Sequence, residues 1–176
     1  MTETDGLAVD LGTIGGWLQR NAPASYRTLR PGLDMAGLVA LETRYGFALH
    51  PELRTLLSWH DGCTHSALAV QIWTDFMFGE SAFMYEQVHS FPDDYWDPRW
   101  VPFATDLGLK KLVVDHGAFP GRVMLFDGVD GMYEDSTWPS LGSMIAQVRE
   151  ALVTSSLLNS RHGTVENGAL YWPEVI

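Results

Sequence analysis

The sequence predicts a single α+β domain over residues 1–176, with an antiparallel sheet at its centre. Apolar residues recur at helical spacing before residue 60 and again after residue 140, whereas the middle of the chain holds short runs typical of strands. No linker rich in Pro, Gly or Ser divides the chain, and its length suits one domain. We expect only residues 1–12 to be flexible.

Three helices are predicted early in the chain. Thr13 is placed to cap a short helix, and Asp34 to cap a stronger one that Gly46 can end. Pro51 occupies what would be the first position of the third helix, which closes at Trp59-His60-Asp61-Gly62.

The centre of the chain predicts the sheet. Residues 67–78 are rich in aromatic side chains and favour a strand, and residues 81–89 favour one or two helical turns. Residues 127–135 are acidic and rich in turn formers, so they predict a connection. Three further strands are expected over residues 100–104, 111–115 and 122–126, with a turn over residues 117–121.

The end of the chain combines a helix with a hairpin. Ser140 is placed to cap the clearest helix, whose apolar residues recur at helical spacing from Leu141 to Leu152. Residues 155–163 are polar and predict a connection. Asn167-Gly168 between apolar residues predicts a β-hairpin, because this pair readily adopts the tight turn between two strands.

The charge balance restricts the partners. The chain carries 22 acidic and 11 basic side chains, a net charge of −11, and its only lysines are Lys110 and Lys111. It therefore lacks the basic footprint of a protein that binds nucleic acid directly, and anionic membrane surfaces are disfavoured for the same reason. The acidity favours a basic partner, or it serves solubility alone.

The cysteine content and the first ten residues indicate where in the cell the protein is expected. Cys63 is the only cysteine, so no disulfide within the chain is possible. Residues 1–10 carry three acidic side chains and no basic one, unlike a signal peptide, and no apolar run approaches the ~20 residues of a membrane span. We expect a cytoplasmic protein.

Three motifs occur in order along the chain. The first is Glu42-x-x-Tyr45-Gly46-Phe47-x-Leu49-x-Pro51-Glu52-Leu53, ending in Trp59-His60-Asp61-Gly62. The second is Trp100-Val101-Pro102-Phe103-Ala104-x-Asp106, followed by Leu112-Val113-Val114-Asp115, and the third is Trp138 with Ser140-Leu141. In this order they resemble the SUKH superfamily, which includes the yeast regulator of cell-wall assembly and many bacterial immunity proteins.

The resemblance implies a central antiparallel sheet flanked by helices, a non-catalytic role and no cofactor. Members are adaptors, and many bacterial ones bind and neutralise a secreted toxin, often a nuclease. One turn departs from the family: residues 107–111, Leu-Gly-Leu-Lys-Lys, replace a glycine-rich or small polar turn. The motif residues expected to be structural are Glu42, Gly46, Pro51, Trp59, His60, Asp61, Gly62, Trp100, Pro102, Phe103, Asp106 and Asp115.

One cluster has the residue types of a catalytic or metal site. A thiol beside imidazoles, as at His60, Cys63 and His65, suits a nucleophile or zinc. The alternative is a helix end, in which His60 faces the negative end of the helix dipole and Gly62 permits a left-handed turn. We favour the helix end and expect no metal ion and no catalytic residue.

Two segments combine aromatic and acidic side chains and are predicted to bind a partner. Tyr and Trp anchor many protein interfaces, and carboxylates suit Arg and Lys on a basic partner. The alternative is that the aromatic rings are core and the acids a solvated rim. The predicted contact residues are Trp73, Asp75, Phe76, Glu80, Asp93, Asp94, Tyr95, Trp96 and Asp97.

Three functions follow from these observations. The leading hypothesis is an immunity protein that covers the active cleft of a basic toxin domain, with a nuclease as the expected target. The alternative is a regulatory adaptor that binds endogenous proteins. The third hypothesis is an enzyme that uses Cys63 or a pair of carboxylates.

Overall fold

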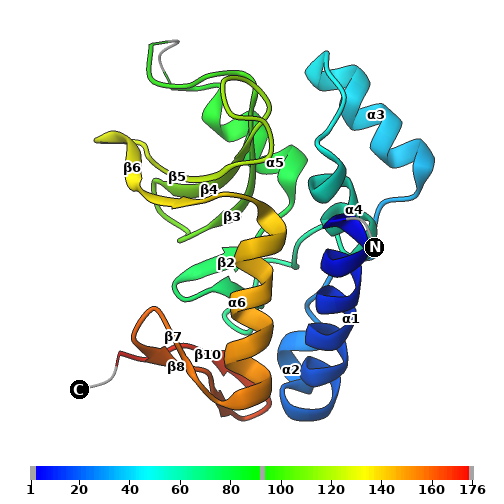
Figure 1. Ribbon diagram of the computed structural model, residues 1–176, viewed down its shortest axis with the longest axis vertical. Helices are drawn as coiled ribbons and strands as arrows, with labels where there is room; N and C mark the ends of the chain where they lie inside the picture. The colour runs from blue at the N-terminus through cyan, green and yellow to red at the C-terminus, as the bar shows by residue number, and fades with distance from the viewer. Residues whose placement is uncertain (1–2, 92–93, 175–176) are drawn as a thin grey trace.

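The computed structural model describes residues 3–91 and 94–174, with the backbone alone at residue 3 and at residues 132–136. It is a single α+β domain, as predicted (Figure 1). The helices are α1 (Glu3–Asn21), α2 (Pro23–Tyr26), α3 (Met35–Tyr45), α4 (Pro51–Trp59), α5 (Ser81–Val88) and α6 (Leu141–Thr154). The strands are β1 (Gln71–Trp73), β2 (Phe76–Phe78), β3 (Trp100–Thr105), β4 (Lys110–Asp115), β5 (Val123–Asp127), β6 (Gly131–Trp138), β7 (Leu157–Leu158), β8 (Arg161–His162), β9 (Thr164–Glu166) and β10 (Ala169–Tyr171).

The central sheet is an antiparallel meander in the order β1-β2-β3-β4-β5-β6. Because successive side chains of a strand point to opposite faces, Leu112 and Val114 of β4 join the main core, whereas Val113 joins a second cluster with Trp96 and Phe126. The three strands predicted over residues 100–126 are confirmed, within one residue at each end.

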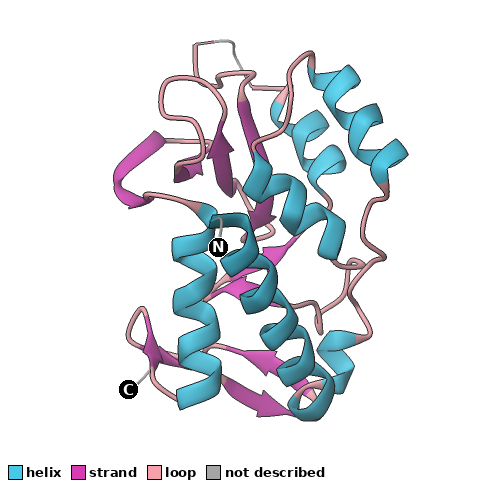
Figure 2. Cartoon of the chain, turned by 45° about the vertical axis from the view of Figure 1, so that its right-hand side comes forward, coloured by secondary structure: helices cyan, strands magenta, loops and turns pink. Residues whose placement is uncertain are grey.

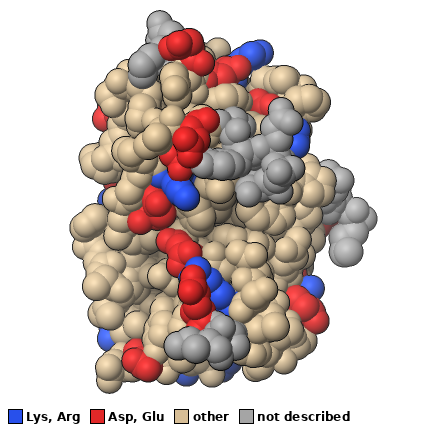
Figure 3. Space-filling model, turned by 90° about the vertical axis from the view of Figure 1, so that its left-hand side faces the viewer, with Lys and Arg blue, Asp and Glu red and all other residues tan. Residues whose placement is uncertain are grey.

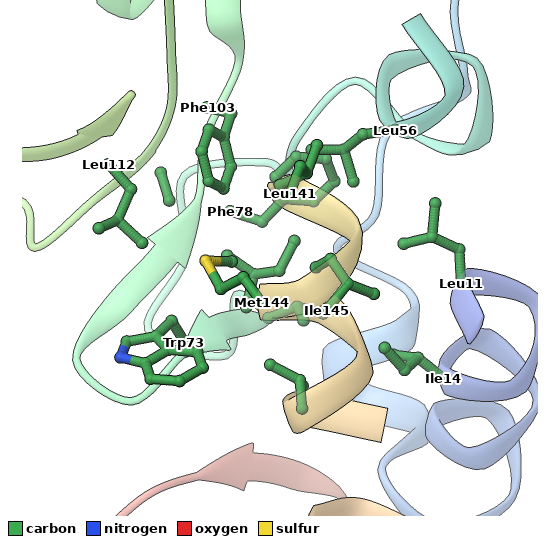
Figure 4. Close-up of a cluster of buried hydrophobic side chains, with 14 of the residues drawn as sticks. Leu11, Ile14, Leu56, Trp73, Phe78, Phe103, Leu112, Leu141, Met144 and Ile145 are labelled. Atoms are coloured by element: carbon green, nitrogen blue, oxygen red, sulfur yellow. The ribbon is translucent and has the colours of Figure 1, made fainter. Parts of the chain in front are cut away.

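The main core lies between the sheet and the helices. Helices α1 and α6 lie side by side, and α6 turns its apolar stripe towards the sheet (Figures 1 and 2). Leu141, Met144 and Ile145 of α6 are fully buried. Met144 extends towards the side of the sheet that holds Leu112, whereas Ile145 extends towards Leu11 of α1 (Figure 4). The two small hairpins β7–β8 and β9–β10 lie at the opposite end of α6 from Leu141 (Figure 1).

The first helix differs from the prediction. Residues 3–12, which were expected to be flexible, are helical, and Leu7 and Leu11 are only 1% exposed. Thr13 does not cap a helix, because its hydroxyl donates to the carbonyl of Val9 one turn earlier, 2.9 Å away. Burial of an apolar stripe outweighs the poor helix propensity of Gly15. That glycine brings the helix close to the indole of Trp59.

Most of the predicted helix and hairpin ends are confirmed. The side chain of Asp34 accepts the amide of Gly37 at 2.8 Å, and Gly46 ends α3 in the left-handed conformation at φ 81°. Ser140 and Ser143 form a reciprocal capping box at the start of α6. Residues 167–168 form the predicted hairpin turn with positive φ at both positions.

Two connections predicted in the sequence contain strands. Residues 131–135 belong to β6, which pairs with β5 at the edge of the sheet. The polar segment 155–163 contains the short β7–β8 hairpin. In both places the backbone forms hydrogen bonds with a neighbouring strand, although the sequence does not alternate apolar and polar residues.

Candidate functional site

The aromatic rings predicted to contact a partner are mostly buried. Trp73 is 6% exposed and meets the ring of Trp138 edge-on, 4.9 Å between centroids. Phe76 is partly buried against the main core. Trp96 is 5% exposed and packs edge-on against Phe126 at 4.9 Å in the second cluster. The expectation of tryptophan anchors at the surface is therefore corrected: both rings are core residues, on opposite faces of the sheet.

The acidic residues of the same two segments do reach the surface. Asp94 and Tyr95 are exposed, whereas Asp93 lies outside the described residues. Arg99 donates to Asp97 and holds the pKa of that carboxyl below its usual value. Three of these acids are held in ion pairs within the chain: Asp75–Arg161 (2.5 Å), Glu80–Arg30 (3.1 Å) and Asp97–Arg99 (2.8 Å).

Aspartates at the strand ends hold the hairpin turns. Asp106 accepts the amides of Gly108 and Lys110 at 2.8 and 3.1 Å. Asp115 is 1% exposed and accepts two amides of the β4–β5 turn, at 2.6 and 2.8 Å. Asp127 accepts the amide of Val129 at 2.8 Å. These carboxylates therefore satisfy backbone donors of the turns, which is a structural role.

The motif around Glu42 joins α3 to α4. The carboxylate of Glu42 accepts the amide of Leu49 at 3.0 Å and pairs with Arg54. The bond from Arg54, followed by that from Leu49, lowers the pKa of Glu42. Gly46 makes the left-handed turn that ends α3, and Pro51 starts α4, where its missing amide has no helical partner to lose.

The motif Trp59 to Gly62 connects α4 to the rest of the fold. Trp59 stacks on Phe78 with 6.2 Å between centroids, and His60 Nδ1 lies 2.6 Å from the carbonyl oxygen of Arg30. Asp61 Oδ2 lies 3.8 Å from the Arg30 guanidinium, while burial raises the pKa of this carboxyl. Gly62 has φ 74° and its carbonyl accepts the Arg30 amide at 2.9 Å. Gly62 makes the expected left-handed turn after α4, and His60 and Asp61 tie this helix end to Arg30.

The motif in β3 is packed rather than exposed. The ring of Trp100 lies edge-on to Trp96 at 5.6 Å, and Phe103 is fully buried. The carbonyl of Pro102 accepts the hydroxyl of Ser81 at 2.7 Å, which fixes α5 on the sheet. Pro102 lies outside the stretch where β2 pairs with β3, so its missing amide costs no bond on that side.

The thiol of Cys63 is a poor nucleophile in this fold. Cys63 is 6% exposed, and burial raises the pKa of its thiol, which disfavours the reactive thiolate. His65, two residues later, is exposed. Over residues 3–91 and 94–174, no group of three or more His, Cys, Asp or Glu side chains is arranged to hold a metal ion.

A cavity of about 370 Å³ lies between α5 and the β3–β4 turn. The ends of β2 and β3 and the segment 63–65 complete its wall. The motifs gave no hint of it, and only the unusual turn at residues 107–111 points to its position. Its lining includes Met77, Phe83, Met84, Thr105, Leu107 and Lys111.

Lys111 places a buried positive charge at the wall of the cavity. This residue is 5% exposed, and its ammonium donates to the Gly108 carbonyl at 2.9 Å and the Thr105 hydroxyl at 3.0 Å. Both partners are neutral, and no carboxylate of the described residues pairs with the ammonium within 4.0 Å. Burial lowers the pKa of Lys111. The neighbouring Lys110 is exposed and pairs with Asp127.

The fold and its turn-forming motifs define an α+β domain of the SUKH type. The sequence profile of the SMI1 / KNR4 family (SUKH-1) matches residues 32–147, well over half of the chain, so the chain belongs to this family. A search of curated proteins returned no match to the chain. Within the described residues, no helix has the length and apolar character needed to cross a membrane.

Proposed function

We propose that this protein is an immunity-type binding domain that neutralises a basic toxin, with a nuclease as the expected target, by covering its active cleft. The observation that carries the proposal is an acidic surface whose cations are already engaged. Among the described residues, at least seven of the eleven basic side chains form ion pairs within the chain, which carries a net charge of −11. These seven are Arg30, Arg44, Arg54, Arg99, Lys110, Arg149 and Arg161.

The acidic side chains form a broken band down one face of the molecule, with a few basic side chains between them (Figure 3). A field of one sign attracts a partner of the opposite sign and speeds their encounter. In a nuclease the cleft that binds the phosphate backbone is basic, so carboxylates of the inhibitor can occupy positions that phosphates take in the substrate. Membership of the SUKH-1 family supports a binding role.

An apolar patch at one end of the sheet supplies contact area. We call it the turn surface: Phe83, Leu107, Leu109 and Val129, which are 57%, 59%, 50% and 63% exposed. The amide of Gly128 donates to the carbonyl of Leu109 at 3.1 Å, so the β3–β4 and β5–β6 turns lie together. Exposed apolar side chains gathered among carboxylates are typical of a protein interface. The turn surface replaces the buried Trp73 and Trp96 as the proposed source of anchors.

The test is co-expression with a toxin encoded beside this gene. We expect the wild type to protect the cells and to bind the toxin less tightly as salt rises. The double variant Leu107→Ser/Leu109→Ser should lose protection, whereas Val9→Ser, which changes an apolar residue 66% exposed on α1, should keep it. Failure of the wild type to protect against any neighbouring toxin, or equal protection by both variants, would refute the proposal.

The alternative is a regulatory adaptor, because the matching family is that of SMI1 / KNR4. An adaptor would co-purify with several endogenous proteins from its native host and would have no toxin partner. Affinity purification from that host separates the two functions, since an immunity protein should retain one dominant partner. For the enzyme hypothesis, a Cys63→Ala variant with full activity in the cellular assay would exclude the thiol.

A further inference from the structure

The cavity beside α5 has the size and the lining of a small-molecule site. Its volume of about 370 Å³ falls within the range of roughly 300–1,000 Å³ that ligand pockets occupy. Met77 and Met84 supply flexible apolar wall, and Phe83 and Leu107 stand exposed at its margin. Such a site typically combines apolar walls with a few placed polar groups, and here the placed group is a buried ammonium.

Among the described residues, one cation that lines the cavity forms no ion pair with a carboxylate. Arg30 lies 3.1 Å from Glu80 and 3.8 Å from Asp61, so this cation has its own counter-ions. Lys111 instead donates to neutral oxygens, and its third contact, to the Lys110 carbonyl, is long at 3.5 Å. Asp106, the carboxylate that acts on it from a distance, accepts two turn amides. Because a buried unpaired charge is costly, an anionic group in the cavity would be stabilised strongly.

The turn that carries Leu107 is strained in a way that shapes the cavity. Leu107 has φ 66°, a left-handed conformation that costs a residue with a Cβ about 1 kcal/mol. Its amide donates to the Thr105 hydroxyl at 3.1 Å, and the same hydroxyl accepts the Lys111 ammonium. The contacts that hold the ammonium therefore also hold the turn that brings Leu107 to the cavity wall. Strain of this kind is often found at ligand sites.

We propose that this cavity binds a small carboxylate with an apolar chain, such as a medium-chain fatty acid, whose carboxylate pairs with Lys111 and whose chain lies against Met77, Met84 and Phe83. A phosphate would need several converging donors, whereas the cavity offers one unpaired ammonium. A cationic guest would face repulsion from the same group. The proposal goes beyond the binding of a toxin and does not depend on it.

The test titrates octanoate into the purified full-length protein, followed by calorimetry and by amide NMR signals. The wild type should bind it, with the largest shifts in the lining segments 63–65, 77–87 and 105–111. Lys111→Met keeps the length of the side chain and removes the charge, so the affinity should fall roughly tenfold or more. Lys110→Met, its exposed neighbour, should bind within about twofold of the wild type, because surface charges contribute little.

Two further probes keep the test decisive. Octylamine, which has the same chain with a cationic head, should not bind. Phe83→Ser changes an exposed wall residue and should weaken octanoate binding severalfold while the circular dichroism spectrum stays unchanged. The proposal is overturned if octanoate does not bind the wild type, if Lys111→Met binds it equally well, or if octylamine binds as tightly. Phe83 and Leu107 belong to both the cavity wall and the turn surface, but octanoate binding and protection of cells are separate readouts, so each proposal can fail without the other.

Discussion

Gly62 and Gly46 provide a matched pair for testing why the first motif needs glycine. Both adopt the left-handed conformation, at φ 74° and 81°. A Cβ on Gly62 would lie 2.3 Å from the backbone carbon of Gly79 and 2.5 Å from the amide nitrogen of Glu80, whereas a Cβ on Gly46 would meet nothing within 4 Å. Alanine at Gly46 should therefore cost only the conformational term, about 1 kcal/mol of unfolding free energy.

Alanine at Gly62 should lower the unfolding free energy further than alanine at Gly46, because a steric clash is added to the conformational cost. The atoms in its way belong to the backbone between β2 and α5, which must move, and overpacking of this kind costs about 2 kcal/mol or more. The total of about 3 kcal/mol is a large part of a typical domain stability of roughly 5–15 kcal/mol. Urea unfolding followed by tryptophan fluorescence and far-UV circular dichroism measures both variants. If Gly62→Ala and Gly46→Ala lose equal stability, the close approach of the two backbones is refuted.

Three further predictions concern single side chains. Burial lowers the pKa of Lys111 below its usual 10.5, so the unfolded chain binds this proton more tightly and the wild type gains stability as pH rises towards 10.5. Lys111→Met should therefore be more stable than the wild type by about 1 kcal/mol at neutral pH, and urea titrations should show the difference shrinking towards pH 10.5. Asp115→Ala leaves two turn amides without their acceptor and should lose about 2 kcal/mol in the same assay, whereas the exposed Asp94→Ala should change little. Ser155 ends α6 at φ 57°, so Ser155→Gly should gain about 1 kcal/mol and raise the melting temperature by about 3 °C; an unchanged melting temperature would contradict a strained helix end.

Local signals predicted the ends of the elements well. Asp34, Gly46, Pro51 and Ser140 act within one or two turns of the chain, so their roles depend little on the rest of the fold. The first helix was missed because its stability comes from packing of its apolar stripe rather than from propensity. Strand β6 was missed because it lies at the edge of the sheet and pairs only with β5. An edge strand can be acidic and need not alternate apolar and polar residues.

The candidate site was harder to predict, for two physical reasons. Large aromatic residues suit a core and an interface equally, so composition alone did not reveal that Trp73 and Trp96 are buried. The cavity is lined by segments that lie far apart in the sequence, from Arg30 to Lys111, and only folding brings them together. Besides the unusual turn at residues 107–111, one further signal was available: alternation along β4 places Lys111 on the same face as the buried Val113.

The aspartates that hold the hairpin turns divide the acidic residues into two populations. Asp115 and Asp127 are tied to turn amides, so selection for folding restrains them whatever the partner. Exposed acids such as Asp94 lie at the surface, where a substitution usually costs the fold little. If the partner changes during evolution, the protein can therefore change its exposed acids while the aspartates bound to turn amides stay fixed. Comparison of related sequences would then separate the contact surface from the scaffold by rate of substitution alone.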